Sequence, residues 1–164
     1  MTTDSQAFKD TLAQWSSGVT VVTTALRETL YGITVSSFAS VSLEPPLISV
    51  CVAKKLFTHG VIEQSGVFAV NFLNHEQVEW AKRFAGFYPA IKDRFADITC
   101  LTAVTGCPVF TDAMGWLDCQ VYRAYDGGDH TILVGEVVAN GRGERSSPPL
   151  VYYNRQWGQF AALD

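Results

Sequence analysis

Apolar segments rich in β-branched residues follow one another along most of this 164-residue chain, without a regular alternation of strand and helix. Residues 19–26, 47–53 and 131–138 are examples, and valine, isoleucine and threonine at this density are typical of strands. Strands that lead directly into neighbouring strands form mainly antiparallel sheets, because a parallel pair needs a long crossover connection. We therefore expect a mainly β fold with short helices (α+β), whose mostly antiparallel sheet curls into a barrel and so removes its edges.

At least six strands are expected. The strand-like segments span residues 19–26, 31–35, 47–53, 67–73, 116–122, 131–138 and 150–153. The first two form a hairpin, and the composition DGGDH at 126–130 predicts a turn between the two long strands.

Three short helices are expected between the strands. The first ends at Gly18 and has Phe8, Leu12 and Trp15 on one face, and the second spans residues 58–64 and is closed by Gly66. A third helix follows a cap formed by Asn74 with Gln77. Residues 86–107 show no regular pattern.

The composition limits the class of protein. An apolar fraction of 48% supplies a core for one domain over residues 1–164 and excludes disorder. A net charge of −4 without a basic run argues against nucleic acid and anionic membranes as partners. The N-terminus does not resemble a signal peptide and no stretch is long enough to span a membrane, so we expect a cytoplasmic protein.

The four cysteines indicate neither disulfides nor a metal site. They lack a CxxC pairing and a matched histidine spacing, so we expect reduced thiols and no metal. The cysteines are Cys51, Cys100, Cys107 and Cys119.

Several common catalytic motifs are absent. The sequence contains no G-x-G-x-x-G after a strand, no Walker loop, no G-x-S-x-G elbow and no H-E-x-x-H. The three histidines lie far apart along the chain. A Rossmann fold and a hydrolase therefore receive little support.

Hydroxyl groups gather in residues 32–42, which hold five of them within nine residues next to an apolar strand. They can form a solvated turn, or they can converge with free backbone N–H groups on a polar, planar or anionic ligand. The residues alone leave both interpretations open.

Cationic side chains offer two further candidates for an anion site. Lys54 and Lys55 precede the helix expected from Thr58, whose hydroxyl can cap that helix while its N-terminus faces a phosphate. Arg83 can clamp a phosphate or, at the i,i+4 spacing, pair with Glu79. Spacing alone does not separate these alternatives.

Seven motifs occur in an order that resembles a known family. They are SGVTVVT at 17–23, GITVSSFASVSLEPPL at 32–47, TH at 58–59, FAVNF at 68–72, RFAG at 83–86, GDHT at 128–131 and LVYY at 150–153. Together they resemble the short-chain flavin reductases, which are the reductase components of two-component flavin-dependent monooxygenases and have the FMN-binding split-barrel fold. Two positions depart from the family pattern. The family often has alanine at the position of Val35 and serine at the position of Phe57.

The resemblance implies a set of site residues. Around the flavin ring and ribityl chain it puts Thr34, Val35, Ser36, Ser37 and Ser40, and beside the flavin it puts Cys51, Val52 and Ala53. At the flavin phosphate it puts Thr58, Lys82 and Arg83. At the nicotinamide nucleotide it puts His130 and Tyr153. No acid or base side chain is strictly required, because the cofactors carry the chemistry.

The resemblance also implies an activity. It points to an NAD(P)H:flavin oxidoreductase that passes a hydride from NADH or NADPH to FMN or FAD, and whose reduced flavin diffuses to a partner monooxygenase. A homodimer is expected, with the N-terminal helix and the aromatic residues 152–160 as candidates to cross between subunits. The alternatives are an electron-transfer protein that holds FMN tightly on the same fold, which His130 disfavours, and a barrel that binds another small molecule.

Overall fold

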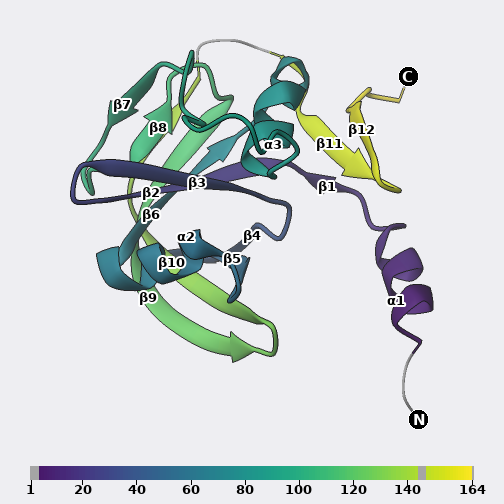
Figure 1. The fold of residues 1–164 in the computed structure, drawn as a ribbon, viewed down its shortest axis with the longest axis horizontal. Helices are drawn as coiled ribbons and strands as arrows, with labels where there is room; N and C mark the ends of the chain where they lie inside the picture. The colour runs from purple at the N-terminus through teal and green to yellow at the C-terminus, as the bar shows by residue number, and fades with distance from the viewer. Residues whose placement is uncertain (1–3, 144–146, 164) are drawn as a thin grey trace.

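The computed structural model describes residues 4–143 and 147–163 (Figure 1). None of the helices in these residues is long and apolar enough to cross a membrane. The elements, in chain order, are α1 (Ser5–Leu12), β1 (Ser17–Gly18), β2 (Thr20–Leu26), β3 (Thr29–Val35), β4 (Ala39–Leu43), β5 (Pro46–Ala53), α2 (Phe57–Ser65), β6 (Val67–Phe72), the 3-10 helix η1 (His75–Gln77), α3 (Val78–Phe84), β7 (Cys100–Thr102), β8 (Pro108–Phe110), β9 (Gly115–Gly127), β10 (His130–Arg142), β11 (Leu150–Tyr153) and β12 (Gln156–Gln159).

Seven strands form the main sheet, in the order β3-β2-β6-β9-β10-β5-β4, and every neighbouring pair in it is antiparallel. Two small sheets accompany it, β1-β11-β12 and β7-β8. The expected fold class, mainly β with three short α-helices and antiparallel pairing, is confirmed. The long hairpin of β9 and β10 extends beyond the rest of the sheet (Figure 1).

The main sheet curls so that the end of β3 approaches β5, although no strand ladder joins these two strands. Instead, the Ser37 hydroxyl accepts a hydrogen bond from the Cys51 backbone N–H at 2.8 Å and donates one to the Cys51 carbonyl at 3.2 Å. We call this junction the seam. Backbone groups at a seam are not all consumed by a ladder, so they remain available to a ligand.

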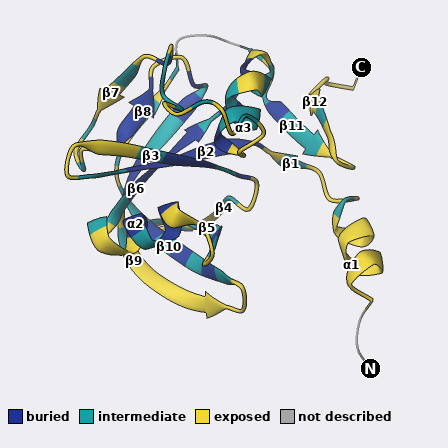
Figure 2. Cartoon of the chain, viewed as in Figure 1, coloured by how far each residue is buried: buried dark blue, intermediate teal, exposed yellow. Residues whose placement is uncertain are grey.

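Two large clusters of buried apolar side chains, beside a third small one, hold the fold together. One fills the interior of the curled sheet and includes Val22, Val50 and Phe68. The other includes Phe84 and Phe110 and packs α3 and the small sheets onto β2. Each such side chain contributes roughly 1.5–3 kcal/mol when it is fully buried. Figure 2 shows this burial in β2 and β6, whereas α1 and the tip of the β9–β10 hairpin are exposed.

The helix ends expected from the sequence are confirmed at two places. Gly66 closes α2 with φ at 69°, in the left-handed region that glycine adopts without a Cβ penalty. Asn74 and Gln77 form the expected capping box. The Gln77 side chain accepts a hydrogen bond from the Asn74 backbone N–H, and the Asn74 side chain accepts from backbone N–H groups of the first turn, including that of Glu76.

Other expectations were wrong. The first helix ends at Leu12 rather than near Gly18 and buries no residue, because Ser17 and Gly18 instead pair with β11. Glu79 pairs with Lys82, not with Arg83. The short strands β4, β7 and β8 were not expected, since three to five residues are too few to show a clear period of two.

Candidate functional site

A cavity of about 220 Å³ opens at the seam, and we call it the seam cavity. One wall comes from the end of β3 and the residues after it, the other from β5 and the turn that follows, and β10 contributes its first residue. Its lining residues are Ile33, Thr34, Val35, Ser36, Ser37, Cys51, Val52, Ala53, Leu56 and His130. Eight of the residues selected from the sequence therefore meet at one place, although they come from three separate strands.

The three hydroxyls at the seam cavity do different work. The Thr34 hydroxyl donates to the Ala81 carbonyl at 2.6 Å and ties β3 to α3, and the Ser37 hydroxyl joins the two walls. The Ser36 hydroxyl has no protein partner among the described residues, so it is available to a ligand. Because β3 ends at Val35, the backbone N–H groups of Ser36 and Ser37 have left the ladder with β2. Such donors stabilise negative charge on a bound ring.

A second cavity, of about 670 Å³, lies between β3, the start of α2 and residues 92–95, and we call it the outer cavity. Its lining residues are Glu28, Thr29, Leu30, Tyr31, Gly32, Phe57, Thr58, Lys92, Asp93, Arg94 and Phe95. Both cavities are lined by residues of β3 and of the turn into α2. Residues 29–32 and 57–58 line the outer cavity, and residues 33–35 and Leu56 line the seam cavity.

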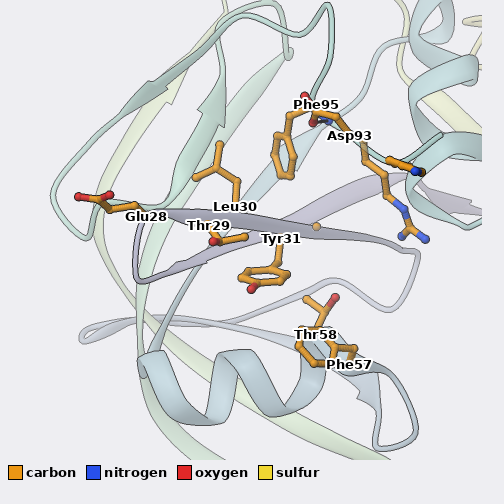
Figure 3. A pocket seen from close by; sticks show the side chains of 11 residues that line it. Glu28, Thr29, Leu30, Tyr31, Phe57, Thr58, Asp93 and Phe95 are labelled. Carbon is orange, nitrogen blue, oxygen red and sulfur yellow. Dashed lines mark hydrogen bonds between the residues drawn. The ribbon is translucent and has the colours of Figure 1, made fainter.

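The outer cavity combines aromatic side chains with charges of both signs, since Glu28 and Asp93 line it beside Lys92 and Arg94. Figure 3 shows the Tyr31 side chain pointing from β3 toward Phe57 and Thr58 at the start of α2. The centroids of the Tyr31 and Phe57 rings lie 5.6 Å apart. Lys92 and Arg94 line the same cavity. Aromatic faces stack on bases and rings, and these cations attract phosphate.

The expected cap of α2 by Thr58 was wrong. Leu56 is the N-cap residue, and no side chain caps the helix in the described structure. Thr58 is instead buried, at 7% exposure, in the wall of the outer cavity. Thr58 is the second residue of α2 and so belongs to its N-terminal turn.

His130 stands at the mouth of the seam cavity and is oriented by its neighbour. Its Nδ1 lies 2.7 Å from the Asp129 carboxylate, so Nε2 is the ring nitrogen left for a ligand. The hydrogen bond from His130 lowers the pKa of the Asp129 carboxyl below its ordinary value, which keeps this partner charged. Across the sheet His130 pairs with Ala53, another residue of the cavity wall.

Four residues selected from the sequence line neither cavity in the described part of the chain. Ser40 sits in β4, and Lys82 is paired with Glu79. The Arg83 guanidinium donates to the Ala96 carbonyl at 2.6 Å and so holds the loop that carries the outer-cavity cations. Tyr153 lies in the small sheet, where its hydroxyl donates to Gln14. Their roles toward flavin and nucleotide stay predictions.

Reasoning from the sequence missed the cations of the outer cavity. Lys92 and Arg94 fall in the stretch 86–107, which has no periodic pattern. The only signal was the pair of cations two and four residues after Ala90, and their approach to Tyr31 depends on how the loop folds back.

Comparison with known proteins gives a consistent result. Residues 12–161 match the family model described as "Flavin reductase like domain". The reductase subunit HsaB of a flavin-dependent monooxygenase from Rhodococcus jostii is 36% identical over 161 residues, which cover 98% of this chain and 79% of the relative.

Solved structures of similar proteins have the same fold. Nitrilotriacetate monooxygenase component B from Mycobacterium thermoresistibile superposes with a TM-score of 0.90 at 32% identity, over 95% of this chain and 86% of that one. The NADH:FAD oxidoreductase SgcE6 of Streptomyces globisporus, solved with NAD and FAD fragments, gives 0.88 at 32% identity, over 96% and 93% of the two chains.

Proposed function

The chain belongs to the flavin reductase family and is an oxidoreductase that acts on flavin, and from this premise we propose how it does so. It takes a hydride from NAD(P)H onto FMN or FAD and supplies the reduced flavin to a partner monooxygenase. The observation that carries the proposal is the seam cavity, where unpaired donors and an oriented histidine meet.

The flavin ring is proposed to lie in the seam cavity. A bound flavin accepts the hydride and passes its electrons on. The backbone N–H groups of Ser36 and Ser37, together with the Ser36 hydroxyl, face the ring and stabilise the negative charge of its reduced form. Val35 is 5% exposed and contributes backbone rather than side chain.

The remainder of the flavin nucleotide is proposed to extend into the outer cavity. Thr58 and the N-terminal turn of α2 supply donors for the phosphate, and Lys92 and Arg94 supply charge. FMN is the smaller ligand that satisfies these contacts. The volume of about 670 Å³ beside the aromatic side chain of Tyr31 also gives room for the adenosine of FAD.

The nicotinamide nucleotide is proposed to approach from the side of His130. The Nε2 of its ring contacts the nucleotide amide or phosphates and positions the nicotinamide over the flavin. Tyr153 is assigned to the same nucleotide by resemblance. It lies in the small sheet and does not line the seam cavity, so we propose that the nucleotide bridges the two residues or that a second subunit supplies Tyr153.

We also propose a homodimer. The α1 face formed by Phe8 and Leu12 is 55% exposed at both residues, and Trp15 and Phe160 are 78% and 61% exposed. Apolar side chains exposed together in this way mark an interaction surface. Light scattering is expected to give twice the chain mass of 18.0 kDa, and a mass of one chain would contradict the dimer.

The test of the activity uses the purified full chain. Oxidation of NADH and NADPH is followed with FMN and with FAD, and flavin binding is measured separately by fluorescence quenching. Replacing Ser36 by alanine is expected to weaken flavin binding, whereas Ser42→Ala, the same change at a β4 residue that lines neither cavity, serves as the control. No quenching at tens of micromolar flavin would contradict the proposal.

A further inference from the structure

The turn that joins β9 to β10 carries His130, yet it projects beyond the body of the sheet (Figure 1). β6 pairs with β9 only as far as Gln120, so the outer half of β9 has no second neighbour strand in the described structure. Most residues from Tyr122 to Asp129 are exposed. The β10–β5 ladder reaches this end of the hairpin only at His130, opposite Ala53, so the turn before His130 depends on contacts beyond the ladder.

Lys54 makes three such contacts. Its ammonium group lies 2.5 Å from the Asp126 carboxylate and donates to the Gly128 carbonyl at 2.7 Å, and its backbone N–H donates to the Asp129 carbonyl at 3.0 Å. Three of the residues just before His130 are thus held by one lysine of the turn after β5. The lysine stem is partly covered, with 38% of its side chain exposed.

A second attachment lies just beyond His130. The His59 Nε2 and the Thr131 hydroxyl are 2.8 Å apart, and both residues are buried, at 7% and 6% exposure. His59 belongs to the first turn of α2, and its Nδ1 faces Glu63 at 3.5 Å. His130 is therefore bracketed by contacts to residues 54–59, the segment that also lines both cavities.

We propose that Lys54, supported by His59, is a positioning residue that latches the β9–β10 turn and so holds His130 at the mouth of the seam cavity. The inference rests on the proposed role of His130 toward the nicotinamide nucleotide. Lys54 lines neither cavity among the described residues, so it acts through the turn rather than on the ligand. An exposed ion pair contributes little to global stability, which gives the latch a local effect.

The first test measures the latch itself by hydrogen exchange and mass spectrometry. In Lys54→Met, amides of residues 126–131 are expected to exchange several-fold faster, while the core strand β6 is unchanged. Thr131→Val, which removes the buried hydroxyl but keeps the shape, is expected to act in the same direction. Lys55→Met is the matched control, because the described structure gives this exposed lysine no hydrogen bond. Unchanged exchange in Lys54→Met would overturn the latch.

The second test measures what the latch does for the reaction. The KM for NADH is expected to rise at least about threefold in Lys54→Met with the flavin Kd unchanged, because apparent affinity falls with the fraction of competent molecules. In a His130→Ala background the same change is expected to have no further effect on KM, since the two residues act in series. Faster exchange with an unchanged KM, or fully additive effects, would overturn the positioning role.

The two arms also separate this inference from the proposed function. Absence of flavin-dependent NAD(P)H oxidation in the wild-type chain would refute the activity. The exchange measurement would still decide whether Lys54 holds the turn, because it needs no substrate.

Discussion

Replacing Gly32 by alanine is expected to destabilise the protein, because the position has no space for a side chain. A Cβ at Gly32 would lie 2.7 and 2.8 Å from two ring carbons of Phe84 and 3.4 Å from Phe95. Real Cβ atoms do not approach carbon this closely, so one of the neighbours would have to move.

The Phe84 ring cannot retreat easily. It is 2% exposed and packs against Phe95 and Phe110, with ring centroids 5.0 and 5.7 Å away. Overpacking of such a core costs about 1–3 kcal/mol. For a chain of this size each kcal/mol lowers Tm by roughly 2–4 °C, so Gly32→Ala is expected to lower it by roughly 2–12 °C.

The assay is thermal unfolding of the flavin-free chain followed by circular dichroism, and Gly60 provides the control. Nothing lies within 4 Å of a Cβ at Gly60, which sits inside α2. Gly60→Ala is therefore expected to stabilise the chain by about 0.5–1 kcal/mol, since glycine disfavours a helix interior.

The clash itself is tested by a compensating change. Adding Phe84→Leu to Gly32→Ala makes room and is expected to recover part of the lost Tm. If Gly32→Ala melts at or above the wild-type temperature, or if both alanine variants shift Tm in the same direction, the packing argument is refuted.

Three further predictions concern the site. His130→Ala is expected to raise the KM for NAD(P)H about tenfold to a hundredfold with flavin affinity unchanged, because one hydrogen bond to a charged group contributes roughly 1.5–3 kcal/mol. KM and kcat values within twofold of wild type would show that His130 does not contact the nucleotide. Iodoacetamide near neutral pH is expected to label the half-exposed Cys51, and bound FMN is expected to block this labelling. Cys100 and Cys119 are expected to react less, because burial raises the pKa of Cys100 to about 11 and of Cys119 to about 12, and equal labelling of all three in mass spectra would contradict this. The hydrogen bond from Lys54, together with that from the Gly128 N–H, lowers the pKa of Asp126, so the contact is complete above the ordinary pKa of 3.8 and is lost only as pH falls through the lowered pKa. The NMR shift of the Gly128 amide is therefore expected to titrate with a midpoint below 3.8, and a midpoint at or above 3.8 would contradict the contact.

Much of the fold could be predicted because its signals are local. β-branched runs marked the hairpin of β2 and β3, Gly66 marked the end of α2, and Asn74 with Gln77 marked the start of the next helix. The N-terminal helix was overextended, because spacing cannot show that β11 recruits Ser17 into a strand.

The candidate site was predicted only in part for a similar reason. Residues 34–37 and 51–53 were selected through the family resemblance, and the structure brings them to one seam with His130. Lys92 and Arg94 were missed, because a loop without a period gives no direction to its side chains.

The sequence by itself determined the longer strands, the turn between β9 and β10 and which residues can offer hydroxyls or charge, because these depend on neighbours along the chain. Only the tertiary structure decided which of these groups remain free. Ser37 and Thr34 are spent on joining elements while Ser36 is left to a ligand, and Lys54 reaches across 72 residues to the turn that carries His130. These choices arise from the curl of the sheet, which sets the distances between strands that are remote in sequence.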